Sequence, residues 1–123
     1  MVRRSVMTTG FLAVLLVFVT HLAQAGIKEF NAAMAEGDYA EALSRFEAYS
    51  SPTPLHQVYQ AAALAGLKEN ERSLLLLERA AKGGYGDADF LEATPWFDGL
   101  REAPRFKAVL EKVRAHQARA AAG

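Results

Sequence analysis

The fold of this chain is decided by the stretch Glu36-Gly37-Asp38-Tyr39-Ala40-Glu41-Ala42-Leu43-Ser44-Arg45-Phe46. Its pattern predicts the turn and the second helix of a helical hairpin. Gly37 suits the left-handed conformation that closes a preceding helix. Asp38 is a good N-cap for the next helix, and Glu41, three residues on, completes a capping-box pattern. Ala42 is expected to face inward, where its small side chain allows two helix backbones to approach closely.

Apolar residues at helical spacing continue on both sides of this stretch. The predicted helices cover residues 27–35, 39–49, 54–65, 71–82 and 104–116, with a short helix at 87–92 and a capped turn at 94–100. No segment shows the alternation of apolar and polar residues that is typical of a strand. We therefore expect an all-α domain, built as a short solenoid of helical hairpins.

The opening stretch carries the pattern Gly-Asp-Tyr-x-x-Ala-x-x-x-Phe, from Gly37 to Phe46, and Pro54 stands in the following loop. These residues resemble the turn and second helix of a tetratricopeptide repeat. A degenerate second copy lies about 31 residues further on. Its packing positions hold Ala61, Ser73, Leu77 and Ala80. Lys68 and Asn70 stand where the resemblance requires glycine and tyrosine.

The segment from Glu78 to Leu110 is similar to the irregular region that closes many bacterial tetratricopeptide arrays. Two repeats are fewer than the three or more that such arrays usually need for stability. We therefore expect the segment from Phe90 to Val113 to act as the missing layer. Its large aromatic residues, which are expected to cover the exposed end of the fourth helix, are Trp96, Phe97 and Phe106.

The N-terminal residues 1–25 have the features of a Sec signal peptide: a basic start, an apolar run and then Ala23-Gln24-Ala25. Cleavage is predicted between Ala25 and Gly26, which makes the protein periplasmic or secreted. The apolar run, from Gly10 to Val19, is well short of the roughly 20 residues that span a bilayer. An uncleaved N-terminal anchor is the alternative. The expected organisation is a signal peptide (1–25), a helical domain (26–116) and a frayed tail (117–123).

Composition argues against several classes of function. Without residues 1–25 the chain keeps 12 basic and 14 acidic residues, and it has no basic stripe of the kind that binds nucleic acid. There is no cysteine, and His56 and His116 stand far apart, so we expect neither a disulfide nor a metal or other cofactor. No serine has a histidine and a carboxylate that the sequence can place beside it. The sequence therefore predicts that the protein is not an enzyme.

Binding is the remaining class of function. In the repeats that this chain resembles, the first helix of each hairpin lines a concave face. Carried over by position, the resemblance implies a partner-binding face of Ile27, Asn31, Met34, Ala35, Leu55, Val58, Ala62 and Ala65. Its mainly apolar character suits a hydrophobic helix or peptide. The alternative is that so short an array has no groove and that these residues are core.

Two functions follow from these expectations. The first is an exported, tetratricopeptide-like adaptor that binds a protein or peptide partner. The second is a membrane-anchored structural or regulatory subunit of a cell-envelope complex, held by the uncleaved N-terminal segment.

Overall fold

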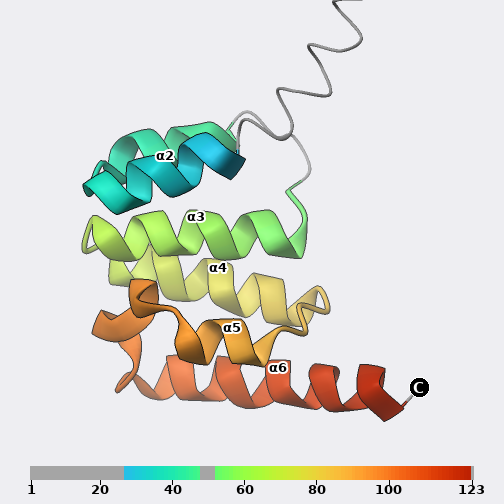
Figure 1. Cartoon of the computed structure of the whole chain (residues 1–123). Coiled ribbons are helices and arrows are strands. Elements are labelled where there is room, and N and C mark those ends of the chain that lie inside the picture. The colour runs from blue at the N-terminus through green and yellow to red at the C-terminus, as the bar shows by residue number, and fades with distance from the viewer. Residues whose placement is uncertain (1–26, 48–51, 123) are drawn as a thin grey trace, which may run out of the picture.

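The computed structural model describes residues 27–47 and 52–122 of the chain. All secondary structure in these two ranges is helical, which confirms the expected all-α fold (Figure 1). Residues 27–36 are helical and are followed by α2 (Tyr39–Glu47), α3 (Pro54–Gly66), α4 (Asn70–Lys82), α5 (Ala88–Ala93), the 3-10 helix η1 (Pro95–Leu100) and α6 (Pro104–Ala122). The predicted signal peptide lies outside the described residues.

Three helices end in the same kind of turn, each with one residue in the left-handed conformation. These residues are Gly37 (φ 77°), Lys68 (φ 65°) and Gly84 (φ 100°). In each turn, the next backbone N–H donates to the carbonyl five residues earlier, over 2.8–2.9 Å. Glycine adopts this conformation freely, whereas it costs a lysine roughly 1–2 kcal/mol. The second hairpin therefore keeps the geometry of the first without its glycine.

Side-chain caps begin the helices that follow. The Asp38 carboxylate accepts a hydrogen bond from the Glu41 backbone N–H at 3.3 Å, as its N-cap position predicts. The Glu41 carboxylate pairs with Arg45 one turn later, and this ion pair replaces the expected reciprocal bond of the capping box. Thr53 caps α3, since its hydroxyl oxygen accepts from the His56 N–H at 3.2 Å. Local sequence thus sets where these helices start.

The central helix of the stack is α3, which packs against α2, α4 and η1. Three consecutive alanines, Ala61 to Ala63, are fully buried on it. Their small side chains let neighbouring helices approach closely. Ser73 of α4 is also fully buried, and its hydroxyl donates to the Ala61 carbonyl oxygen at 2.6 Å. This bond satisfies the buried hydroxyl between α3 and α4.

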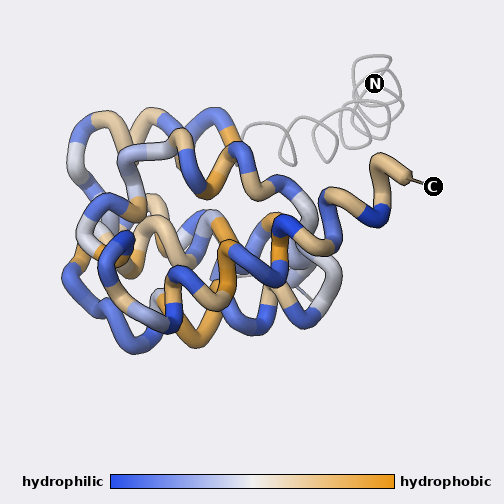
Figure 2. Tube along the Cα trace, turned by 90° about the horizontal axis from the view of Figure 1, so that it is seen from below, coloured by the Kyte–Doolittle hydropathy of each residue, from blue (hydrophilic) through white to orange (hydrophobic). Residues whose placement is uncertain are grey.

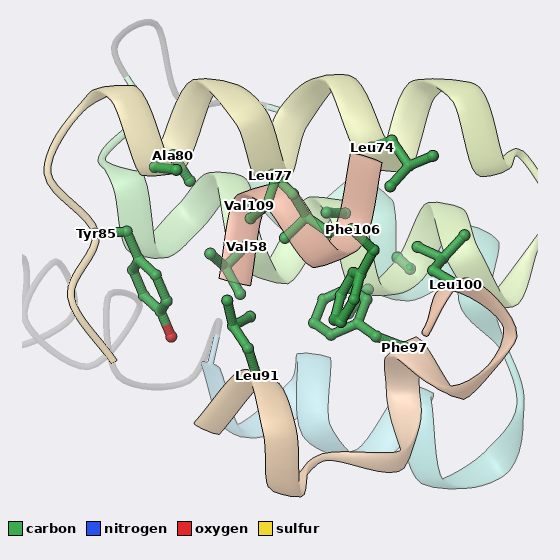
Figure 3. Close-up of a cluster of buried hydrophobic side chains, with 14 of the residues drawn as sticks. Val58, Leu74, Leu77, Ala80, Tyr85, Leu91, Phe97, Leu100, Phe106 and Val109 are labelled. Carbon is green, nitrogen blue, oxygen red and sulfur yellow. The ribbon is translucent and has the colours of Figure 1, made fainter. Parts of the chain in front are cut away.

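The C-terminal elements close the open side of the stack. Figure 3 shows side chains from η1 and α6 meeting those of α4 in one buried cluster. The rings of Phe97 and Phe106 have centroids 5.9 Å apart, and both side chains are almost fully buried. On the outside, Arg105 of α6 donates two hydrogen bonds to the Glu78 carboxylate of α4, at 3.0 and 2.7 Å. Through these contacts, η1 and α6 add a further layer to the two hairpins.

The C-terminal tail differs from the expectation of fraying after His116, because α6 continues as a helix to Ala122. Gln117 accepts a hydrogen bond from the Ala88 N–H at 2.7 Å and donates one to Asp89 at 3.2 Å. It thereby caps the start of α5, 29 residues earlier in the chain. The last turn of α6 is exposed and extends beyond the stack (Figure 2). The folded domain therefore includes Gln117.

Candidate binding cleft

The predicted partner-binding face is divided by the structure into exposed and buried residues. Ile27 and Leu55 are 37% and 42% exposed, and Asn31 and Ala35 are also exposed. Ala65 is half-buried. Met34, Val58 and Ala62 are 6%, 0% and 0% exposed. They belong to the core.

The sequence predicts Trp96 over the end of α4. Its ring instead lies against the first two hairpins, with centroid distances of 5.6 Å to Phe30 and 6.4 Å to Tyr59. Phe90 of α5 lies on its other side at 5.8 Å. Edge-to-face contacts of this kind stabilise aromatic clusters. A side chain from η1 therefore packs against both the first helix and α3.

A cleft of about 670 Å³ lies beside Trp96, where the first two hairpins face η1. The residues that line it come from five helices (residues 27–36, α2, α3, α4 and η1) and from the turn between α3 and α4: Met34, Tyr39, Ala62, Ala65, Gly66, Lys68, Asn70, Pro95, Trp96, Asp98, Gly99 and Leu100. Its volume lies within the range of ligand-binding pockets. Met34, Ala62 and Ala65, which the sequence placed on the partner-binding face, form part of its floor.

One wall of the cleft is the contact between Tyr39 of α2 and Gly66 at the end of α3. A Cβ atom built on Gly66 would lie 2.4 Å from two atoms of the Tyr39 ring. Only glycine therefore lets the ring lie flat against α3. Beyond this contact, Asn70 begins α4 with a side chain that is shorter than a tyrosine. The cleft continues into the space beside it.

The opposite wall is η1, which is fixed by a dense set of polar contacts. Thr94 caps it, with the hydroxyl oxygen 3.4 Å from the Trp96 N–H. The Arg101 guanidinium donates to the carbonyl oxygens of Leu91, at 3.1 Å, and of Thr94. It also pairs with the Asp98 carboxylate at 2.8 Å. These bonds fix the position of η1 beside the cleft.

Charge in the cleft is unevenly compensated. Lys68 and Asp98 are the charged residues that line it. Asp98 is neutralised by Arg101, whereas no ion pair joins Lys68 to any described residue. The carboxylates that follow Lys68 are paired as well, Glu69 with Arg72 at 3.0 Å and Glu71 with Arg105 at 2.6 Å. The cleft therefore presents one uncompensated positive charge.

The ionisable groups that the fold perturbs most lie outside the cleft. Burial raises the pKa of the Tyr85 phenol well above its usual range, with a smaller contribution from Asp87. Hydrogen bonds from Arg105 lower the pKa of Glu78. His116 is engaged with the Ala81 carbonyl oxygen, 2.9 Å from its Nε2. Within the two described ranges, no three His, Cys, Asp or Glu side chains come together as a metal site.

Comparison with known protein families, with curated proteins and with solved structures finds no match for this chain. The resemblance to tetratricopeptide repeats stays a prediction that rests on the residues themselves. Over the described residues, no helix combines the length and the apolar character needed to cross a membrane.

Sequence reasoning missed the residues that define the cleft, above all Lys68, Asn70 and Gly99. A signal for the first two was present, since both depart from the repeat pattern at the second turn. Nothing local indicated Gly99, because its place in the cleft depends on how η1 folds back against the first two hairpins.

Proposed function

We propose that this chain is an exported, tetratricopeptide-like adaptor that binds a protein or peptide partner without catalysing a reaction. The observation that carries the proposal is the cleft beside Trp96. It is formed by the folded chain itself, has one wall held by Arg101, and combines apolar surface with a few polar groups. This combination is typical of recognition sites.

The chemistry of the cleft favours binding over catalysis. Asp98 is held by Arg101 and therefore lies in an ion pair rather than beside a nucleophile. Lys68 is exposed. Catalytic groups usually lie within hydrogen-bond reach of one another, with a base that a third group orients. Lys68 and Asp98, the charged residues that line the cleft, do not form such a set.

Site-specific photo-crosslinking in intact cells tests the proposed site. A photoactivatable residue at Asn70, which lines the cleft, should form an adduct with a partner protein. The same residue at Glu111, exposed on α6, serves as the matched control and should form none. A second change, Gly99→Trp, should suppress the Asn70 adduct because its side chain would project into the cleft.

The Gly99→Trp block is compatible with the fold, because a Cβ at Gly99 meets no atom within 4 Å. Equal adducts at Asn70 and Glu111, or an Asn70 adduct that persists in the blocked protein, would contradict binding in the cleft. Circular dichroism of the Gly99→Trp protein controls for unfolding.

Export is tested separately, by mass spectrometry of the protein from fractionated cells. A chain that starts at Gly26 and is found outside the membrane fraction would support the adaptor. Residues 1–25 retained on the membrane-bound protein would favour the alternative of an anchored subunit in an envelope complex.

A further inference from the structure

The two departures from the repeat pattern lie side by side in the cleft. Gly37 and Tyr39 of the first turn correspond by position to Lys68 and Asn70 of the second. Lys68 has nevertheless kept the left-handed conformation, with φ 65° against 77° at Gly37. A turn that needed only this shape would be better served by glycine. The lysine side chain therefore requires an explanation outside the turn.

The exchange at Asn70 changes the shape of the same place. In the first hairpin, Tyr39 covers the end of α3 by lying against Gly66. In the second, Asn70 lines open space, with Lys68 beside it and Trp96 also lining the cleft. Asn70 in place of tyrosine thus leaves open space and supplies an amide group. Lys68 in place of glycine supplies a positive charge. Both act on the same part of the surface.

We propose that the partner presents an acidic peptide segment to this cleft, with an apolar side chain against Trp96 and a neighbouring Asp or Glu carboxylate at Lys68. This inference rests on the proposed function and specifies the chemistry of the partner. Charge complementarity carries it, because Lys68 is the uncompensated charge among the residues lining the cleft. The Asn70 amide can donate a hydrogen bond to the same carboxylate or to the peptide backbone.

Selection from a phage library of random peptides on the immobilised protein tests the proposal. Peptides that the wild-type protein retains and the Gly99→Trp protein loses are those bound in the cleft. Among these we expect an apolar residue flanked by Asp or Glu to be enriched. Lys68→Glu should shift the enrichment to Lys and Arg. Lys82→Glu, the same change of charge at the exposed opposite end of α4, should leave it acidic.

The affinity of the protein for a selected peptide gives a quantitative test of the inference. For one selected acidic peptide, fluorescence anisotropy at low ionic strength should show about two- to fivefold weaker binding to the Lys68→Gly protein, as expected for loss of one exposed ion pair. Added salt should reduce this difference. Lys68→Gly keeps the turn conformation, so weaker binding would report the lost charge rather than a damaged fold.

The outcomes separate this inference from the proposed function. Peptides that Gly99→Trp blocks but that carry no acidic preference, or whose preference Lys68→Glu leaves unchanged, would overturn the inference and leave cleft binding intact. If no retained peptide is sensitive to Gly99→Trp, both the inference and the proposed function are contradicted. Concentration-dependent dimers of the wild-type protein that Gly99→Trp abolishes would identify a second copy as the occupant, which also overturns the inference.

Discussion

We expect Gly66→Ala to destabilise the protein, although alanine is the better helix former. The new Cβ would lie 2.4 Å from Cγ and Cδ1 of the Tyr39 ring and 2.7 Å from Cδ2. Carbon atoms in contact prefer about 3.5–4.0 Å, so the ring must move by about 1 Å. Overpacking of this kind costs about 1–3 kcal/mol. Helix propensity offsets at most about 1 kcal/mol, since Gly66 ends α3.

The expected net loss is therefore about 1–2 kcal/mol of unfolding free energy. Urea denaturation followed by far-UV circular dichroism measures it. Removing the Tyr39 ring should abolish or reverse this loss of stability. In a Tyr39→Ala background, Gly66→Ala should be neutral or stabilising by up to about 1 kcal/mol. The double-mutant cycle should then give a coupling energy of about 2 kcal/mol between the two positions.

Gly99→Ala is the matched control, because a Cβ there meets no atom within 4 Å. It should change stability by less than about 0.5 kcal/mol. A coupling energy near zero, or a Gly66→Ala protein more stable than the wild type, would refute the contact between Tyr39 and α3. The assignment of Tyr39 and Gly66 to one wall of the cleft would then be wrong as well.

Three further changes test other parts of the fold. Ala42→Trp should abolish cooperative thermal unfolding, because Ala42 is fully buried between helices; a melting curve like that of the wild type would contradict this packing. Lys68→Gly should leave stability equal or raise it by up to about 1 kcal/mol in urea denaturation, since it relieves the left-handed lysine; a clear loss would contradict the cost assigned to that turn. Glu78→Gln should destabilise the protein at pH 7. Hydrogen bonds from Arg105 lower the folded-state pKa of Glu78, so its contribution is present above the unfolded pKa and is lost as the pH falls through the folded value. The difference from the wild type should shrink below about pH 4, and a difference independent of pH would argue against the ion pair.

The helices and most of their starts were predictable from short stretches of sequence. Gly37 and Asp38 mark the end of one helix and the start of the next, and Thr53 caps α3. The capping bonds connect residues three positions apart, and the turn bonds span five. A signal with this range is readable without knowing the rest of the fold. The inward spacing of Ala42 and of Leu77 was readable for the same reason.

The candidate site was not predictable in this way. The sequence pattern predicted that Met34, Val58 and Ala62 lie on an open partner-binding face. It also predicted Trp96 over the end of α4. In the folded chain the Trp96 ring lies against that of Phe30, 66 positions earlier in the sequence. Gln117 similarly reaches Ala88 across 29 residues. Such contacts depend on the path of the whole chain.

Local sequence was enough to predict an all-α chain of helical hairpins, because helix periodicity and capping are local properties. It also marked Lys68 and Asn70 as departures from the pattern of the first turn. That these departures share a cleft with Trp96 and Gly99 depends on contacts between segments far apart in the chain. The physical reason is that η1 folds back to bury apolar surface that two hairpins leave open. The position of that segment therefore determines which residues line the cleft.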